Sequence, residues 1–277
     1  MMTRYIGKNL FILTAILTLA SMVHSKSLAS SIKEETVTYK SGGISLKGFV
    51  AYDESIKGKR PVILIVHEWW GLNDYARMRA RMLAELGYFA MAVDMFGDGK
   101  TAANPKEAQE FTSPFYKDPK MARVLLDAAI LKIAGYPQVD PASIAAIGYC
   151  FGGFIVLNAA KLGAPLKGVV SFHGGLGGLP ADKKLLQSKI LVCHGGSDKF
   201  VPQHDIDALK HSLDSIGADY TIKVYAGATH AFTNPDATKN GKEFNLPIEY
   251  NAVADKASWN DMKVFLGRIF VKGGTRP

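Results

Sequence analysis

Three residues of this chain carry the side chains of a nucleophile, an acid and a base. Cys150 lies in Gly148-Tyr149-Cys150-Phe151-Gly152-Gly153, Asp198 in the run from Gly195 to Pro202, and His230 in the run from Gly227 to Phe232. A thiol needs a neighbouring base to become a thiolate, and an imidazole needs an acid to fix its tautomer. The chain therefore predicts nucleophilic catalysis by Cys150, with His230 as base and Asp198 as orienting acid.

The segment around Cys150 has the form of a nucleophile elbow, with Cys in the place of Ser. The apolar run Ser143–Gly148 predicts a buried strand, and Phe154–Leu162 has the pattern of a helix. Glycines on both sides of the nucleophile permit a sharp turn between these elements. The positive end of the helix would also favour the reactive thiolate. On this stretch alone, a buried Cys in a Gly-rich turn is the alternative.

Two backbone amides are candidates for an oxyanion hole, those of Phe151 and Trp69. In such a turn one N–H comes from the residue after the nucleophile and the other from the loop after an early strand. Glu68, which precedes Trp69, would then lie near the thiol of Cys150, where a carboxylate can hold a neutral thiol or repel a thiolate. The alternative for Glu68 is an acid in a solvated loop.

The other histidines are weaker candidates for the base. His204 and His211 lie within the helical pattern of Gln203–Ile216. His67, His173 and His194 lie at the ends of predicted strands, where a structural hydrogen bond is the default role.

The N-terminus predicts a signal peptide over residues 1–25. Arg4 and Lys8 precede the apolar segment Leu10–Val23, whose 14 residues are fewer than the ~20 that span a bilayer. Small residues before Lys26 offer a cleavage site. We therefore expect a periplasmic or secreted protein without a stable membrane anchor after cleavage, with residues 26–277 as one domain.

Composition sets limits on the class of protein. The chain has 277 residues, is 48% hydrophobic and carries a formal net charge of +8, with basic residues spread singly and in pairs. No basic run is interleaved with aromatic residues, so nucleic-acid binding is not indicated. Cys150 and Cys193 are the two cysteines. Cys193 is predicted on a strand that lies one further along the sheet than the neighbour of the elbow strand. The two cysteines would then be too far apart for a disulfide.

The elements that must position these residues alternate between strand and helix. We predict an α/β-hydrolase fold, with a mostly parallel central sheet, helices on both faces and an N-terminal antiparallel hairpin within 35–52. Further strands are predicted at 61–66, 88–93, 166–172, 189–194 and 219–225, and helices at 74–86, 105–115, 119–134 and 248–270. Ligands bind outside the carboxyl ends of such strands, which is where all three candidate catalytic residues lie.

Four motifs together resemble the dienelactone hydrolase family: His67-Glu68-Trp69-Trp70-Gly71, the Cys150 elbow, Gly196–Pro202 and His230-Ala231-Phe232. The resemblance runs over nearly all of the predicted mature chain. It implies the Cys150, His230, Asp198 triad, a resting thiol held by Glu68, and a pocket lined in part by Trp69 and Phe200. It implies neither a metal nor an organic cofactor.

The chain also departs from this family. Members that open dienelactones bind the substrate carboxylate with arginines, one of them shortly after the catalytic His, whereas this chain reads Ala231-Phe232-Thr233-Asn234-Pro235. The segment 233–250 is either a lid that resets specificity or a flexible surface insertion. We expect a monomeric exported hydrolase of a small ester or lactone. The alternatives are a broad carboxylesterase or thioesterase for uncharged acyl groups, and a non-catalytic binding protein.

Overall fold

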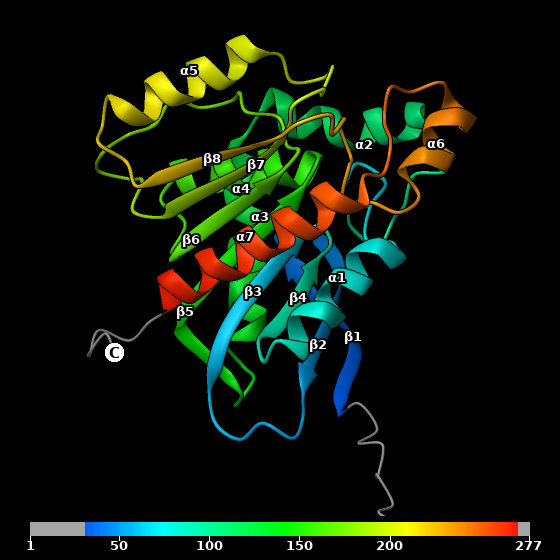
Figure 1. Cartoon of the computed structure of the whole chain (residues 1–277). Coiled ribbons are helices and arrows are strands. Elements are labelled where there is room, and N and C mark those ends of the chain that lie inside the picture. Colours follow the sequence, from blue (N-terminus) through cyan, green and yellow to red (C-terminus); the bar gives the residue numbers. More distant parts are fainter. Residues whose placement is uncertain (1–30, 271–277) are drawn as a thin grey trace, which may run out of the picture. The chain divides into compact units, whose positions relative to one another are not determined.

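The described strands of this chain form one sheet of eight, in the order β1-β2-β4-β3-β5-β6-β7-β8 (Figure 1). The computed structural model describes residues 31–270, so the predicted signal peptide lies outside the described residues. The strands are β1 Ile32–Ser41, β2 Ile44–Asp53, β3 Arg60–Val66, β4 Phe89–Val93, β5 Val139–Tyr149, β6 Gly168–Phe172, β7 Lys189–Gly195 and β8 Tyr220–Tyr225.

The sheet is mixed, as the sequence predicts. β1 and β2 form an antiparallel hairpin, β2 pairs antiparallel with β4, and every pair from β4 to β8 is parallel. The side chains of β4 and β6 are buried throughout, because helices cover both faces of the parallel part. The predicted α/β-hydrolase architecture is confirmed.

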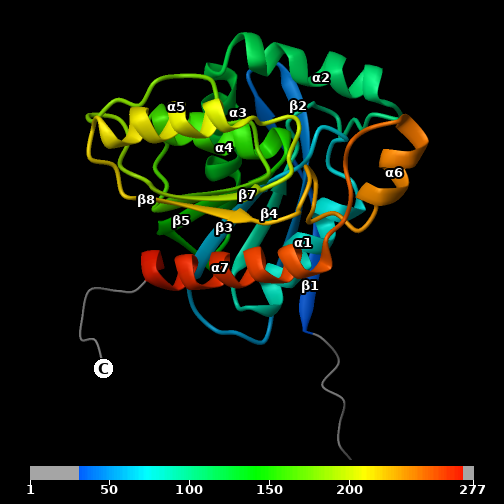
Figure 2. The same ribbon diagram turned by 45° about the horizontal axis from the view of Figure 1, so that its top comes forward.

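Helices cover the two faces of the sheet in two groups (Figure 2). The apolar side chains of α3, α4 and α5 join one core cluster, and those of α1 and α7 join the other. The helices are α1 Asp74–Glu85, α2 Pro105–Lys117, α3 Lys120–Ile133, α4 Phe151–Lys161, α5 Gln203–Asp214, α6 Ala237–Phe244 and α7 Ala252–Phe270.

The segment 233–250 is structured, and the prediction of a helix from residue 248 was wrong by one turn. The segment contains α6, and α7 begins only at Ala252. Ile248 instead forms a parallel bridge with His230, which keeps the chain extended there. Gly241 of α6 packs so closely on this strand-like piece that a Cβ would lie 2.4 Å from the Ile248 carbonyl oxygen. The segment is therefore tied to the loop that carries His230.

Candidate active site

The strand β5 and the helix α4 meet at Cys150, which has φ 53° and ψ −114°. This strained turn is possible because the residues two positions before and after Cys150 are glycines. A Cβ at Gly148 would lie 2.0 Å from the carbonyl oxygen of Gly152, and a Cβ at Gly152 would lie 2.2 Å from the carbonyl oxygen of Val66. Helix α4 thus crosses β3 and β5 in backbone contact, and the thiol is set at the N-terminus of α4.

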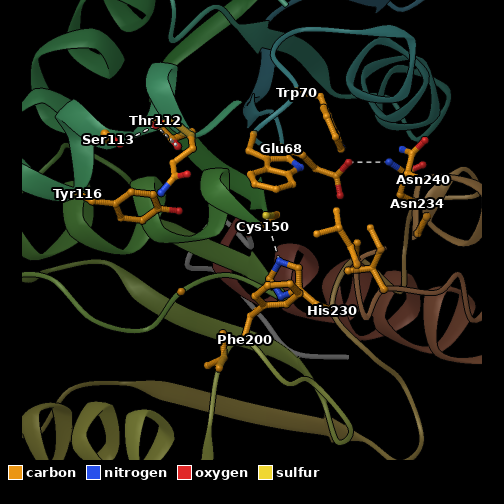
Figure 3. Close-up of a pocket in the computed structure, with 18 of the residues that line it drawn as sticks. Glu68, Trp70, Thr112, Ser113, Tyr116, Cys150, Phe200, His230, Asn234 and Asn240 are labelled. Atoms are coloured by element: carbon orange, nitrogen blue, oxygen red, sulfur yellow. Dashed lines mark hydrogen bonds between the residues drawn. The ribbon is translucent and has the colours of Figure 1, made fainter. Parts of the chain in front are cut away.

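Cys150, His230 and Asp198 form a continuous chain of contacts (Figure 3). The Sγ of Cys150 lies 3.0 Å from Nε2 of His230. Nδ1 of His230 lies 2.8 Å from Oδ2 of Asp198. The other oxygen of Asp198 accepts the backbone N–H groups of Phe200, at 2.8 Å, and of Val201, at 3.2 Å. The carboxylate is thereby fixed in the orientation that receives the imidazole.

The imidazole of His230 is basic despite its burial. Burial alone would lower its pKa, but the charge of the Cys150 thiolate and the hydrogen bond to Asp198 together outweigh it and raise the pKa to about 10. The raised pKa favours the protonated form of His230. His204 and His211 lie on α5, and neither lines the cavity at Cys150.

The two amides predicted for an oxyanion hole both lie at this site. Phe151 is the first residue of α4, and Trp69 follows β3 at the same end of the sheet. Neither amide donates a hydrogen bond to any other described residue. Both donors therefore remain open to a substrate oxygen.

Glu68 is buried, with 3% of its surface exposed, so it is not an acid in a solvated loop. Its Oε2 accepts a hydrogen bond of 2.6 Å from Nδ2 of Asn234. No described residue bonds its Oε1. Burial raises the pKa of Glu68 to about 7, although the Asn234 bond opposes this. The expectation that Glu68 holds the resting thiol does not match this arrangement, because the thiol is bonded to His230.

Above Cys150 lies a cavity of about 600 Å³ whose surface is mainly apolar. Trp69 is partly buried and Phe200 is 49% exposed, and both line this cavity. Of the described residues that line it, Lys117 is the one lysine or arginine, and its side chain is exposed. The lining comes mainly from α2 on one side (Gln109, Thr112, Ser113, Tyr116) and from α6 and its flanks on the other (Ala231, Asn234, Ala237, Asn240, Leu246, Ile248).

A buried polar network behind the elbow was not predicted. Nδ1 of His173 accepts the backbone N–H of Cys150 at 3.1 Å, and its Nε2 lies 2.7 Å from Oγ1 of Thr233. The same hydroxyl lies 2.6 Å from the hydroxyl of Tyr75 on α1. Burial lowers the pKa of His173 well below the usual range, so the ring is neutral and can accept at Nδ1. The network links the turn at the nucleophile to the loop after His230.

Arg79 anchors this network from α1. It is 2% exposed, and its Nη2 donates to the carbonyl of Thr233 at 2.7 Å and to Asp255 of α7 at 2.6 Å. Its guanidinium also lies 5.2 Å from the ring centre of Tyr75. The sequence held a signal for it, since Arg79 lies four residues after Tyr75 on the apolar face of α1.

Both cysteines are free thiols, as predicted. Phe172 of β6 pairs with Tyr149 on one side and with Cys193 on the other, which places Cys193 two strands from the elbow. Within residues 31–270, no group of three or more His, Cys, Asp or Glu side chains is arranged to hold a metal ion. In the same range no helix combines the length and apolarity that a bilayer crossing requires.

Comparison with known proteins gives consistent matches. The model of the dienelactone hydrolase family matches residues 46–270. A Methylorubrum extorquens protein named provisionally as a carboxymethylenebutenolidase is 32% identical over 189 residues, which cover 63% of this chain and 64% of that protein. The crystal structure of a dienelactone hydrolase-like promiscuous phosphotriesterase from metagenomic libraries is 33% identical, with a TM-score of 0.80 over 86% of this chain and 99% of that one. A structure titled m3DLH is 34% identical, with a TM-score of 0.81 over 87% and 99%.

Proposed function

The chain belongs to the dienelactone hydrolase family, whose members hydrolyse ester bonds, and from this premise we propose that it cleaves small esters or lactones through a thioester on Cys150. One observation carries the proposal. The sulfur of Cys150, the ring of His230 and the carboxylate of Asp198 stand in one line of contacts at a cavity of about 600 Å³. That volume suits a small molecule.

In the first half-reaction the thiolate of Cys150 attacks the ester carbonyl carbon, and the carbonyl electrons move to oxygen. The N–H groups of Phe151 and Trp69 receive this oxyanion. When the carbonyl re-forms, the carbon–oxygen bond to the alcohol breaks, and protonated His230 gives its proton to the leaving alkoxide. The acyl group then remains on sulfur as a thioester.

In the second half-reaction water replaces the alcohol. His230, now neutral, takes a proton from water, and the resulting hydroxide attacks the thioester carbon. Collapse of the second tetrahedral intermediate breaks the carbon–sulfur bond and releases the acid. The thiolate and the imidazolium are restored, and Asp198 supports the positive ring at both stages through its 2.8 Å contact. Side chains and amides of the chain supply every step.

Uncharged acyl groups fit this cavity better than a dienelactone carboxylate. Asn234 lies four residues after His230, in the loop where an arginine would face such a carboxylate, and exposed Lys117 is the one lysine or arginine of the described lining. Lys is a poor substitute for the planar fork of Arg. Leu246 and Ile248 add apolar surface on the α6 side. A broad carboxylesterase or thioesterase is therefore the favoured form of the proposal.

We also propose export, as a monomer, after cleavage close to Ser25. The charged start and the short apolar segment of the N-terminus support export. Expression of the full chain in a bacterium, followed by fractionation and N-terminal sequencing, tests it. Protein retained in the cytoplasm with Met1 intact would contradict export.

The test of the activity is a substrate panel on residues 26–277: dienelactone, p-nitrophenyl acetate and butyrate, a thioester and a neutral phosphotriester, with Cys150→Ala as control. We expect Cys150-dependent turnover of the acetate and butyrate above that of dienelactone. The phosphotriester tests the side activity named for the metagenomic relative. Absence of Cys150-dependent turnover on every compound would favour a binding protein on the same fold.

A further inference from the structure

Glu68 shares the cavity of Cys150, yet its carboxylate is directed away from the sulfur. Figure 3 shows the carboxyl group turned toward Asn234, while the sulfur faces His230. Because 3% of its surface is exposed, Glu68 has little access to water, and its carboxylate is held mainly by contacts within the protein. Its one hydrogen bond within the described residues is to Nδ2 of Asn234, at 2.6 Å.

The amide of Asn234 cannot be reversed without loss of a contact. Its Oδ1 accepts the backbone N–H of Asp236 at 2.9 Å, so its NH₂ group is the end that meets Glu68. The backbone of Asn234 is fixed as well, because its N–H donates to Ala231 and its carbonyl accepts from Ala237, both at 2.9 Å. A rigid turn therefore presents a hydrogen-bond donor to the carboxylate.

The position of the carboxylate decides the state of the thiol. A carboxylate at the sulfur would hold the proton of a neutral thiol or repel a thiolate, and either effect would weaken the contact with His230. The charged groups that act on Glu68 come from several elements: His230 and Arg79 favour its charged form, and Asp236 opposes it. None of the three is hydrogen-bonded to it, so Asn234 is the contact that sets its direction.

We propose that Asn234 is a positioning residue that holds Glu68 off the thiol, so that the chain assembles the Cys150–His230 pair without help from a charged substrate. The inference rests on the proposed role of Cys150 as nucleophile. It extends the proposed function, because a site that needs no substrate carboxylate to free its thiol is open to uncharged esters.

The test measures the thiol alone. The rate of Cys150 alkylation by iodoacetamide is followed from pH 5 to pH 10 in the wild type, Asn234→Ala, Glu68→Gln and the double variant, with Cys193 as the buried internal reference. In Asn234→Ala the released Glu68 side chain can turn to the sulfur, where its neutral form can hydrogen-bond the neutral thiol and its charged form would repel a thiolate. The pH of half-maximal alkylation should therefore rise by about one unit, which is a tenfold loss of rate on the acid side. The profile of Glu68→Gln is the reference with which the double variant is compared.

The double variant separates positioning from simple damage to the turn. If Asn234 acts through the carboxylate, the loss seen in Asn234→Ala disappears when Glu68 is Gln. An unshifted profile in Asn234→Ala, or an equal loss in the double variant, would overturn the proposal. The assay needs no substrate, so an enzyme that fails on every ester could still pass it, and the two proposals fail independently.

Discussion

Asp198 offers the sharpest test of the triad, because the structure predicts that Asn is a worse replacement than Ala. The Oδ1 of Asp198 accepts the N–H groups of Phe200 and Val201, and its Oδ2 receives Nδ1 of His230. In Asp198→Asn the amide oxygen must face the two backbone donors, so the NH₂ group faces His230. Nδ1 would then have to accept, and Nε2, the atom next to the sulfur, would already carry a proton.

The expected cost follows from two contributions. Both variants lose the hydrogen bond to a charged group, which costs about 1.5–3 kcal/mol. In Asp198→Asn the reactive tautomer, with its proton on Nδ1, also sets two buried N–H groups against each other, which costs about 1–3 kcal/mol more. The sum of roughly 3–6 kcal/mol is a fall of about 10²–10⁴ in kcat/KM. In Asp198→Ala no amide opposes a proton on Nδ1, so His230 can adopt either tautomer and the fall should be about 10–10². The N–H groups of Phe200 and Val201 also lose their acceptor, and that cost falls on the stability of the protein.

The assay is hydrolysis of p-nitrophenyl butyrate by both variants, with folding checked by near-ultraviolet circular dichroism. Iodoacetamide titration should show in both variants that the thiolate is less favoured, since the acid that supports protonated His230 is absent. Equal activity of the two variants, or an Asn variant more active than the Ala variant, would refute the tautomer argument. A loss below about threefold in both would remove Asp198 from the triad.

Three further predictions concern stability. Gly152→Ala places a Cβ 2.2 Å from a β3 carbonyl and should lower the melting temperature by about 6 °C or more, whereas Gly177→Ala, with nothing within 4 Å, should leave it unchanged. Arg79→Met removes the 2.6 Å contact to the Asp255 carboxylate and should lower the free energy of unfolding in urea by about 3–5 kcal/mol. Burial raises the pKa of Glu68 to about 7, so its charged form opposes folding and stability falls as pH rises from the unfolded value of 4.5 through 7. Glu68→Gln should therefore stabilise the protein by about 2–3 kcal/mol more at pH 8 than at pH 5, and an equal effect at both would contradict the assignment.

The sequence predicts which residues meet at Cys150 when their positions are fixed by strand ends or by glycines. The apolar run before Cys150 is long enough for a buried strand, and a side chain at either Gly148 or Gly152 would meet backbone, so the motif allows one turn geometry. Asp198 and His230 follow strands of the same parallel sheet, and such strands end at one edge. Local pattern and sheet topology are enough to bring these three loops together.

The start of helix α7 and the burial of Arg79 depend on tertiary contacts that the local sequence pattern does not show. The stretch from Ile248 has the periodicity of a helix, but the bridge to His230 keeps it extended, and α7 begins at Ala252. Arg79 looks like a surface residue by type, and only its place on the apolar face of α1 hints that it is buried. Tertiary contacts decide both cases, as they commonly override local preference.

The direction of Glu68 shows the same limit at the level of chemistry. The motif His67-Glu68-Trp69 places the carboxylate near the thiol, but which neighbour it bonds depends on a residue 166 positions away. That residue donates to Glu68 only because the N–H of Asp236 occupies its other end. We therefore expect the residue at position 234 to decide whether the Glu68 carboxylate lies at the thiol or away from it. Sequence motifs can identify the parts of such a site, whereas its resting state follows from how those parts share a few buried hydrogen bonds.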